Sequence, residues 1–255
     1  MIALTPLALA IVAVATIAML LVPRRWAPAP LLLATCYMFI SQGVEIAGMS
    51  FPAVRQIVLA GLLRVALRGE FTGLRFGAID QAMVLWALCA LAVSPFRDDP
   101  QATFIFNGGL VFNTCGVYFL LRAFCRSIDD LVRLACICAV LLTPIALEMV
   151  YEKLASSNLF AVLGGVADQP NIREGRVRAQ GPFAHSILAG SVGATALPLC
   201  LGLWHHYRHM AILGAAASAT MVVASTSSGP LLSALFSVFA LLLWHRREHV
   251  RLLRW

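Results

Sequence analysis

Charged side chains are scarce in this sequence. Only 12% of its 255 residues are charged, whereas 60% are hydrophobic, and the mean hydropathy is +0.85. An ordinary soluble domain has a charged fraction of about 25%. These proportions exclude such a domain and favour a protein that lies within a membrane.

The sequence also has little lysine and no evident cluster of metal-ligating residues. Lys153 is the only lysine, and nearly all the arginines flank apolar segments rather than a solvated basic surface, so no nucleic-acid partner is expected despite the net charge of +7. The 7 cysteines lie mostly inside apolar runs, where cysteine behaves as a small hydrophobic residue. We therefore expect no disulfide, no metal site and no cofactor.

Long apolar runs are abundant. A helix needs about 20 mostly apolar residues to cross a membrane, and such runs predict an all-α polytopic transmembrane bundle of about nine spans, forming one membrane domain over residues 1–255. The first run has no basic residue ahead of it, which favours a span over a removable signal peptide. The expected spans are 2–22, 29–49, 52–68, 80–96, 102–121, 130–150, 183–204, 209–226 and 229–244.

The third of these spans has an alternative. Arg55 and Arg64 interrupt its apolar run, so it is also consistent with a re-entrant or interfacial helix.

The arginines indicate an orientation. One set of alternate loops contains most of them, including Arg24 and Arg25, and cytoplasmic loops carry the excess of Lys and Arg. This rule predicts an external N-terminus and a cytoplasmic C-terminus. Loop 151–182, the longest connection, is then external although it carries several basic residues.

That external loop contains an arginine cluster, Arg173, Arg176 and Arg178. A guanidinium group binds phosphate or carboxylate oxygens through two parallel contacts that an ammonium group does not reproduce. The cluster therefore predicts a diphosphate-binding site. The alternative is a solvated loop whose arginines reach lipid headgroups.

Two helix starts are expected beside this cluster. Pro182 suits the first position of the seventh span, where its missing N–H costs nothing. The ninth span begins after the hydroxyl residues Ser227 and Ser228 with Gly229. Because the free N–H groups at a helix N-terminus bind anions, these three residues are also candidate substrate-binding residues.

Other polar residues lie within the apolar runs. His185, expected one turn into the seventh span, is a candidate general base, and the alternative is a packed histidine that bonds a neighbouring helix. Gln42 with Glu45, and Glu148 with Glu152, are expected one helical turn apart in spans two and six. These groups are expected to balance the arginines or, alternatively, to bind sugar hydroxyls.

Two segments resemble a known family. RVRAQGPFAHSILAG (176–190) and STSSGPLL (225–232) are similar to the O-antigen ligase and O-antigen (exopolysaccharide) polymerase superfamily of bacterial inner-membrane glycosyltransferases. The family pattern is an external arginine, Gly-x-Phe, a His or Asn near a Pro at the head of a helix, and Ser-Arg-Gly or Ser-Ser-Gly two spans later. The resemblance covers mainly residues 173–232.

The resemblance implies a metal-independent membrane glycosyltransferase. Such an enzyme transfers a glycan from an undecaprenyl-diphosphate donor to a glycan or lipid acceptor on the periplasmic face, with membrane lipids and other polysaccharide assembly proteins as partners. Arg178, supported by Arg176, matches the arginine ahead of Gly-x-Phe. Its implied role is to bind the diphosphate and stabilise charge on the leaving group.

The sequence departs from the family pattern at several points. Ser186 stands where the family often has Pro, and Ser228 where many members have a second arginine. Family members continue with a long external loop bearing a proposed histidine base and with further spans, a part that we expect to be missing after Trp255. His185 or a partner would then supply the base. The alternative is a non-catalytic membrane subunit or transporter that binds anionic lipid-linked sugars.

Overall fold

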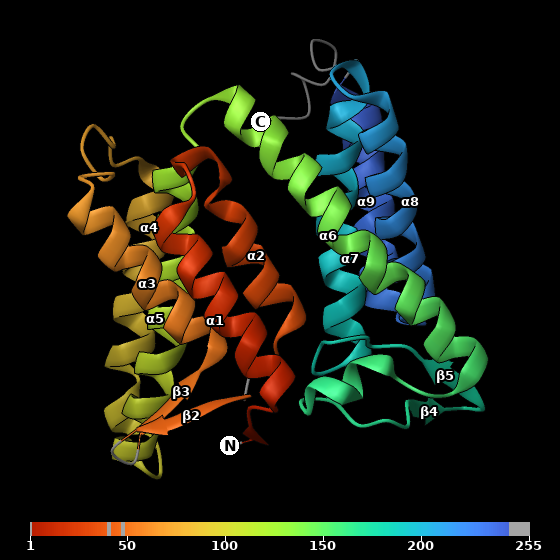
Figure 1. Ribbon diagram of the computed structural model, residues 1–255, viewed down its shortest axis with the longest axis horizontal. Helices are drawn as coiled ribbons and strands as arrows, with labels where there is room; N and C mark the ends of the chain where they lie inside the picture. Colours follow the sequence, from red (N-terminus) through yellow and green to blue (C-terminus); the bar gives the residue numbers. More distant parts are fainter. Residues whose placement is uncertain (1, 40–41, 47–48, 245–255) are drawn as a thin grey trace.

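The computed structural model describes residues 2–39, 42–46 and 49–244, and within them the protein is almost entirely helical, as the composition predicts (Figure 1). The helices are α1 (Pro6–Leu21), α2 (Pro28–Tyr37), α3 (Ala53–Leu67), α4 (Ala78–Ala92), α5 (Pro100–Phe124), α6 (Ile128–Ala155), α7 (Ser186–Leu201), α8 (Arg208–Ala224) and α9 (Ser228–Trp244). The strands are β1 (Ile2–Ala3), β2 (Gln42–Ile46), β3 (Met49–Pro52), β4 (Asn171–Arg173) and β5 (Arg176–Arg178).

The helices form two groups that lie side by side, α1–α5 and α6–α9 (Figure 1). One apolar core joins α1, α2, α3 and α5, and another joins α6, α7 and α8. Helix α2 connects the groups, because the hydroxyl of Tyr37 donates a hydrogen bond of 2.7 Å to the carbonyl oxygen of Leu141 in α6. The Tyr37 ring also packs edge-on against Phe160, with ring centroids 5.7 Å apart.

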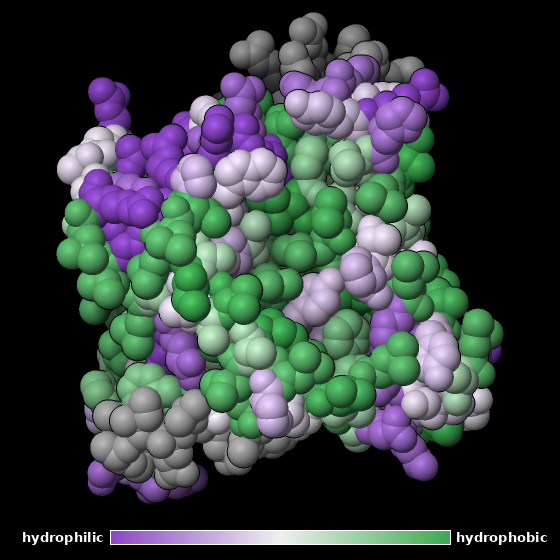
Figure 2. Space-filling view, in the orientation of Figure 1, coloured by the Kyte–Doolittle hydropathy of each residue, from purple (hydrophilic) through white to green (hydrophobic). Residues whose placement is uncertain are grey.

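Successive helices run in alternating directions, so the connections gather at two ends of the molecule (Figure 1). We call one end the hairpin end; it contains β1, the β2–β3 pair, connection 93–99, the β4–β5 hairpin and turn 225–227. The other, the arginine-rich end, contains connections 22–27, 68–77, 125–127 and 202–207. Figure 2 shows hydrophilic residues mostly at the ends and a largely hydrophobic surface between them.

Four of the described helices have the length and hydropathy needed to cross a membrane. They are Ala78–Phe96, Pro100–Phe124, Ile128–Ala155 and Ser186–His205. Three apolar helices are shorter: Arg208–Ala224 packs beside α6 and α7, Ser228–Trp244 packs beside α7, and Pro6–Leu21 packs beside α2 and α3. Because a large apolar surface remains exposed on these helices, the fold is that of a membrane protein.

The second expected span does not form one helix. Helix α2 ends at Tyr37, and β2 and β3 follow as an antiparallel pair in which Gly43 lies opposite Pro52. A Cβ at Gly43 would collide with the backbone of Phe51 and Pro52, so this close pairing requires glycine. The expectation that Gln42 and Glu45 lie one helical turn apart is therefore wrong, since both lie in β2.

A buried arginine explains the charge in the third expected span. Arg64 of α3 is 1% exposed, and its Nη1 donates hydrogen bonds of 2.7 and 2.8 Å to the carbonyl oxygens of Met19 and Val22. These carbonyls belong to the C-terminal end of α1, which lacks intrahelical donors. Two further bonds of 3.0 Å join the guanidinium to the carboxylate of Glu70. Arg64 thus caps a neighbouring helix, and α3 lies in the core of its group.

Candidate anion-binding site

The arginine cluster lies on a β-hairpin. In β4 and β5, Asn171 pairs with Arg178 and Arg173 pairs with Arg176. Because residues paired across antiparallel strands share a face and side chains alternate along each strand, all three arginines lie on one face of the hairpin. The turn consists of Glu174 and Gly175, whose φ angles of 53° and 71° have the positive sign of a type I′ turn.

The hairpin is attached to the turn between α8 and α9. The backbone N–H of Ala179 donates to the carbonyl oxygen of Ala224 over 3.3 Å, and the hydroxyl of Thr226 donates to the carbonyl oxygen of Val177 over 3.3 Å. A side-chain bond of 2.6 Å runs from Nη2 of Arg178 to the hydroxyl oxygen of Ser227. These contacts bring together segments that are about fifty residues apart in the chain.

A pocket of about 410 Å³ lies where the hairpin meets the starts of α7 and α9. All six candidate substrate-binding residues line it, so the structure brings together the two segments that the sequence singled out. Its lining residues are Arg173, Glu174, Arg176, Arg178, Ile187, Thr226, Ser227, Ser228, Gly229 and Pro230. Four of these lining residues were not among the candidates: Glu174, Thr226, Ile187 and Pro230. Glu174 lies within the arginine cluster and Thr226 within the hydroxyl run, and these positions in the sequence could have identified them.

The pocket carries excess positive charge. Among the described residues, neither Arg176 nor Arg178 forms an ion pair, and Arg173 pairs only with the exposed Glu174, at 3.6 Å. Arg173 and Arg176 also face each other across the hairpin, and like charges in that position destabilise a strand pair. The free N–H groups of the first turn of α9 lie at the same pocket. An anion between these groups would relieve the repulsion.

Arg178 is the most enclosed of the three arginines. Its side chain is partly buried, and its Nε is buried without a hydrogen-bond partner among the described residues. A buried donor without a partner costs about 1–3 kcal/mol. Such a group is expected to bind a ligand oxygen readily.

Two buried glutamates of α6 bind backbone N–H groups of loop 156–185, and one of them supports the segment that carries Arg178. A carboxyl oxygen of Glu152 accepts hydrogen bonds from the backbone N–H groups of Gln180 and Gly181, at 3.0 and 2.9 Å. Glu148 accepts a bond of 3.0 Å from the backbone N–H of Leu159. Glu148 and Glu152 lie one turn apart in α6, as expected, but they bond to backbone N–H groups and to the Asn158 side chain rather than to arginines.

The start of α7 differs from the expectation. The helix begins at Ser186 with His185 as its N-cap, so Pro182 is not its first residue and His185 does not lie one turn inside it. Residues 180–183 instead form a turn, in which the backbone N–H of Phe183 donates to the carbonyl oxygen of Gln180 over 3.1 Å and Gly181 has a φ of 56°. Glu152 holds this turn through the backbone N–H groups of Gln180 and Gly181. His185 is exposed and does not line the pocket.

The described residues contain no group of three or more His, Cys, Asp or Glu side chains arranged to hold a metal ion. The donors at the anion-binding pocket are guanidinium, hydroxyl and backbone N–H groups, and such groups suit phosphate oxygens. Comparisons of the chain with models of protein families, with curated protein sequences and with solved structures gave no match.

Proposed function

We propose that the protein binds the diphosphate group of a polyprenyl-linked glycan and transfers the glycan to a glycan or lipid acceptor, as a lipid-linked glycan polymerase or ligase. The main support is the pocket in which three arginines on one hairpin face meet the N-terminus of α9. A diphosphate has enough oxygens to engage all of these donors at once. The resemblance of segments 176–190 and 225–232 to the O-antigen ligase and polymerase superfamily agrees with this choice of ligand.

The pocket would act on the leaving group. In the transfer, an acceptor hydroxyl oxygen bonds to the anomeric carbon, the bond from that carbon to the diphosphate breaks, and its electron pair stays on the diphosphate. Arg178 and Arg176 would stabilise the charge that develops there, which is often the largest catalytic contribution. The acceptor proton goes to a base, for which His185 is the candidate.

A second function has specific support. The pocket lining contains Glu174 as its only carboxylate and no histidine. An anion site without an adjacent base fits a non-catalytic membrane subunit or transporter that binds lipid-linked sugars. Both functions require the diphosphate contact, and only the enzyme requires turnover.

The protein is further proposed to reside in a bacterial inner membrane, with about nine passes, an external N-terminus and a cytoplasmic C-terminus. The alternation of α1–α9 supports this arrangement, and Arg24, Arg25 and Arg126 lie at the end opposite the hairpin. The C-terminal tail, which carries further arginines, lies outside the described residues. In this orientation the pocket opens on the periplasmic side.

Binding of a short polyprenyl diphosphate tests the diphosphate contact. The purified protein in detergent is titrated with farnesyl diphosphate and, separately, with farnesol. Binding should require the diphosphate, and Arg178→Ala should weaken it by at least about tenfold, as expected for loss of a charge-assisted contact. Arg75→Ala, at the arginine-rich end, is the matched control. Equal affinity of the Arg178→Ala variant and the wild type would overturn the proposal.

Turnover distinguishes the two functions. Donor consumption and release of polyprenyl diphosphate are followed with a diphosphate-linked oligosaccharide and an acceptor. Release that depends on Arg178 and on the acceptor supports the transferase. Binding without release supports the non-catalytic subunit or transporter. Glu174→Gln, which removes a negative charge from the pocket, should strengthen farnesyl diphosphate binding in either case.

A further inference from the structure

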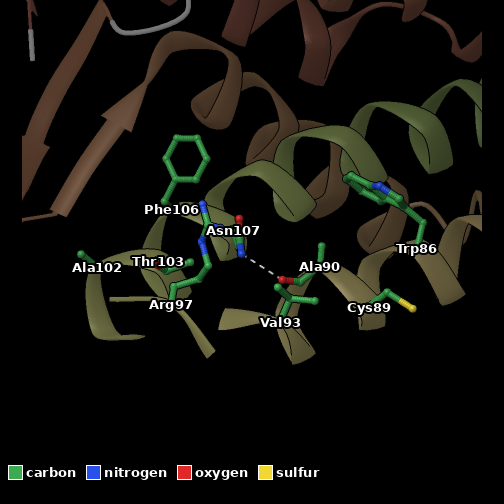
Figure 3. Close-up of a pocket in the computed structure, with 9 residues that line it drawn as sticks. All are labelled: Trp86, Cys89, Ala90, Val93, Arg97, Ala102, Thr103, Phe106 and Asn107. Atoms are coloured by element: carbon green, nitrogen blue, oxygen red, sulfur yellow. Dashed lines mark hydrogen bonds between the residues drawn. The ribbon is translucent and has the colours of Figure 1, made fainter. Parts of the chain in front are cut away.

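A second pocket lies between α4 and α5 at the hairpin end, and we call it the α4–α5 groove. Its volume is about 690 Å³. One wall is a stripe along α4 and its C-cap, and the other is the first two turns of α5 (Figure 3). The groove is lined by Trp86, Cys89, Ala90, Val93, Arg97, Ala102, Thr103, Phe106 and Asn107.

Asn107 fixes the separation of the two helices. Its Nδ2 donates a bond of 2.9 Å to the carbonyl oxygen of Ala90 and one of 3.0 Å to the hydroxyl of Ser94, which is fully buried. Figure 3 shows the first of these bonds crossing from α5 to α4. These bonds hold α4 and α5 together where both helices line the groove.

Arg97 provides the charge of the groove. Among the described residues its guanidinium forms no ion pair and no hydrogen bond, and Figure 3 shows its side chain beside Asn107 and Phe106. Asp98 and Asp99 follow directly, but neither lines the groove. Asp99 is occupied as the N-cap of α5, where its carboxylate accepts a bond of 2.9 Å from the backbone N–H of Ala102.

The surroundings of the groove are apolar. Of the four helices long enough to cross a membrane, those formed by Ala78–Phe96 and Pro100–Phe124 have the smallest buried fraction. Within the groove itself, Trp86, Val93 and Phe106 are exposed. In a bilayer these side chains would contact lipid, so the groove would open to lipid, with Arg97 in the connection between its two helices.

We propose that the α4–α5 groove binds one anionic phospholipid. The acyl chain lies against Trp86, Val93 and Phe106, and the phosphate accepts hydrogen bonds from the guanidinium of Arg97 and the hydroxyl of Thr103. The rings of Trp86 and Phe106 offer the acyl chain a broad apolar contact area. Because Arg97 is a cation that no described residue pairs with, a lipid with net negative charge binds more tightly than a zwitterionic one of the same chain length.

Lipid retention tests this site without reference to the sugar donor. The full-length protein in detergent is mixed with phosphatidylglycerol or with phosphatidylcholine of identical chains, and retained lipid is measured by native mass spectrometry. The wild type should prefer phosphatidylglycerol, and Arg97→Gln should lower its retention by about fivefold. Arg25→Gln, an exposed arginine at the other end, should leave retention unchanged. Excess inorganic phosphate should not displace the lipid.

A second variant tests the apolar wall. Ala102→Trp fills the groove from an exposed position of α5 and leaves Arg97 in place; it should lower retention while the melting temperature stays near that of the wild type. Asp98→Asn should raise retention. Equal retention by the wild type and Arg97→Gln, equal loss in both arginine variants, or displacement by free phosphate would each overturn the proposal.

Discussion

Nη2 of Arg178 donates a hydrogen bond of 2.6 Å to the hydroxyl oxygen of Ser227, and this bond joins the β4–β5 hairpin to the start of α9. The hydroxyl proton of Ser227 is directed elsewhere, to the carbonyl oxygen of Ser225 at 3.1 Å, so the oxygen is free to accept. One end of the guanidinium is thus fixed before a ligand arrives. A group that is already oriented loses little entropy on binding.

Ser227→Ala should weaken anion binding although it leaves every arginine in place. Without the acceptor, the Arg178 side chain gains rotamer freedom, and the affinity for farnesyl diphosphate should fall by about fivefold, less than in Arg178→Ala. Isothermal titration calorimetry measures the difference. Ser191→Ala is the matched control, because the Ser191 hydroxyl bonds only within its own helix, to the carbonyl oxygen of Ile187. Unchanged affinity of Ser227→Ala would show that the bond does not orient Arg178.

Glu152→Ala should destabilise the fold and weaken anion binding together. Glu152 is fully buried, and its loss leaves the N–H groups of Gln180 and Gly181 without an acceptor. We expect the free energy of unfolding to fall by about 3 kcal/mol, measured by denaturant titration in mixed micelles. Glu152→Gln keeps an acceptor oxygen, so its free energy of unfolding should fall by less than that of Glu152→Ala. Glu174→Gln, at the exposed hairpin turn, is the control for stability; an equal loss there would contradict the prediction.

The sequence predicted the helical class because that feature depends on local composition. Alternation of apolar runs with short polar connections is sufficient to place α4–α9 within a few residues. The arginine cluster and the start of α9 were expected on the same side, and they meet at the pocket although Arg178 and Ser227 lie about fifty residues apart in the chain.

Features that depend on distant backbone were not predictable. Nothing near Gly181 indicates that a glutamate of α6 will hold a turn at residues 180–183, ahead of the start of α7 at Ser186. The end of α2 at Tyr37 likewise depends on strand pairing between β2 and β3. Arg55 and Arg64 suggested a re-entrant or interfacial helix. The partners of Arg64, the terminal carbonyls of α1, could not be identified because they lie 42 and 45 residues away in the chain.

Arg64→Met should be among the most destabilising substitutions in the α1–α5 group. It removes donors to Met19 and Val22 and leaves the Glu70 carboxylate without its partner. Breaking a buried ion pair costs about 3–5 kcal/mol, and unfolding in mixed micelles measures the loss. Arg68→Met is the matched control on the next turn: Arg68 is exposed and donates one bond, to the carbonyl oxygen of Leu20. In the Arg68→Met control, the free energy of unfolding should fall by about 1 kcal/mol or less. Similar losses in both variants would contradict a special role for Arg64.

Opposite ends of the molecule should lie on opposite sides of the membrane. Asp168→Cys places a thiol at the hairpin end, and Arg75→Cys places one at the arginine-rich end. Since cytoplasmic loops carry the excess of arginine, a membrane-impermeant maleimide should label only Asp168→Cys in intact cells. Both variants should be labelled after the membrane is permeabilised, which controls for exposure, and the wild type measures labelling of the native cysteines. Labelling of Arg75→Cys alone would reverse the orientation and place the arginine pocket in the cytoplasm, where an external glycan acceptor does not reach it.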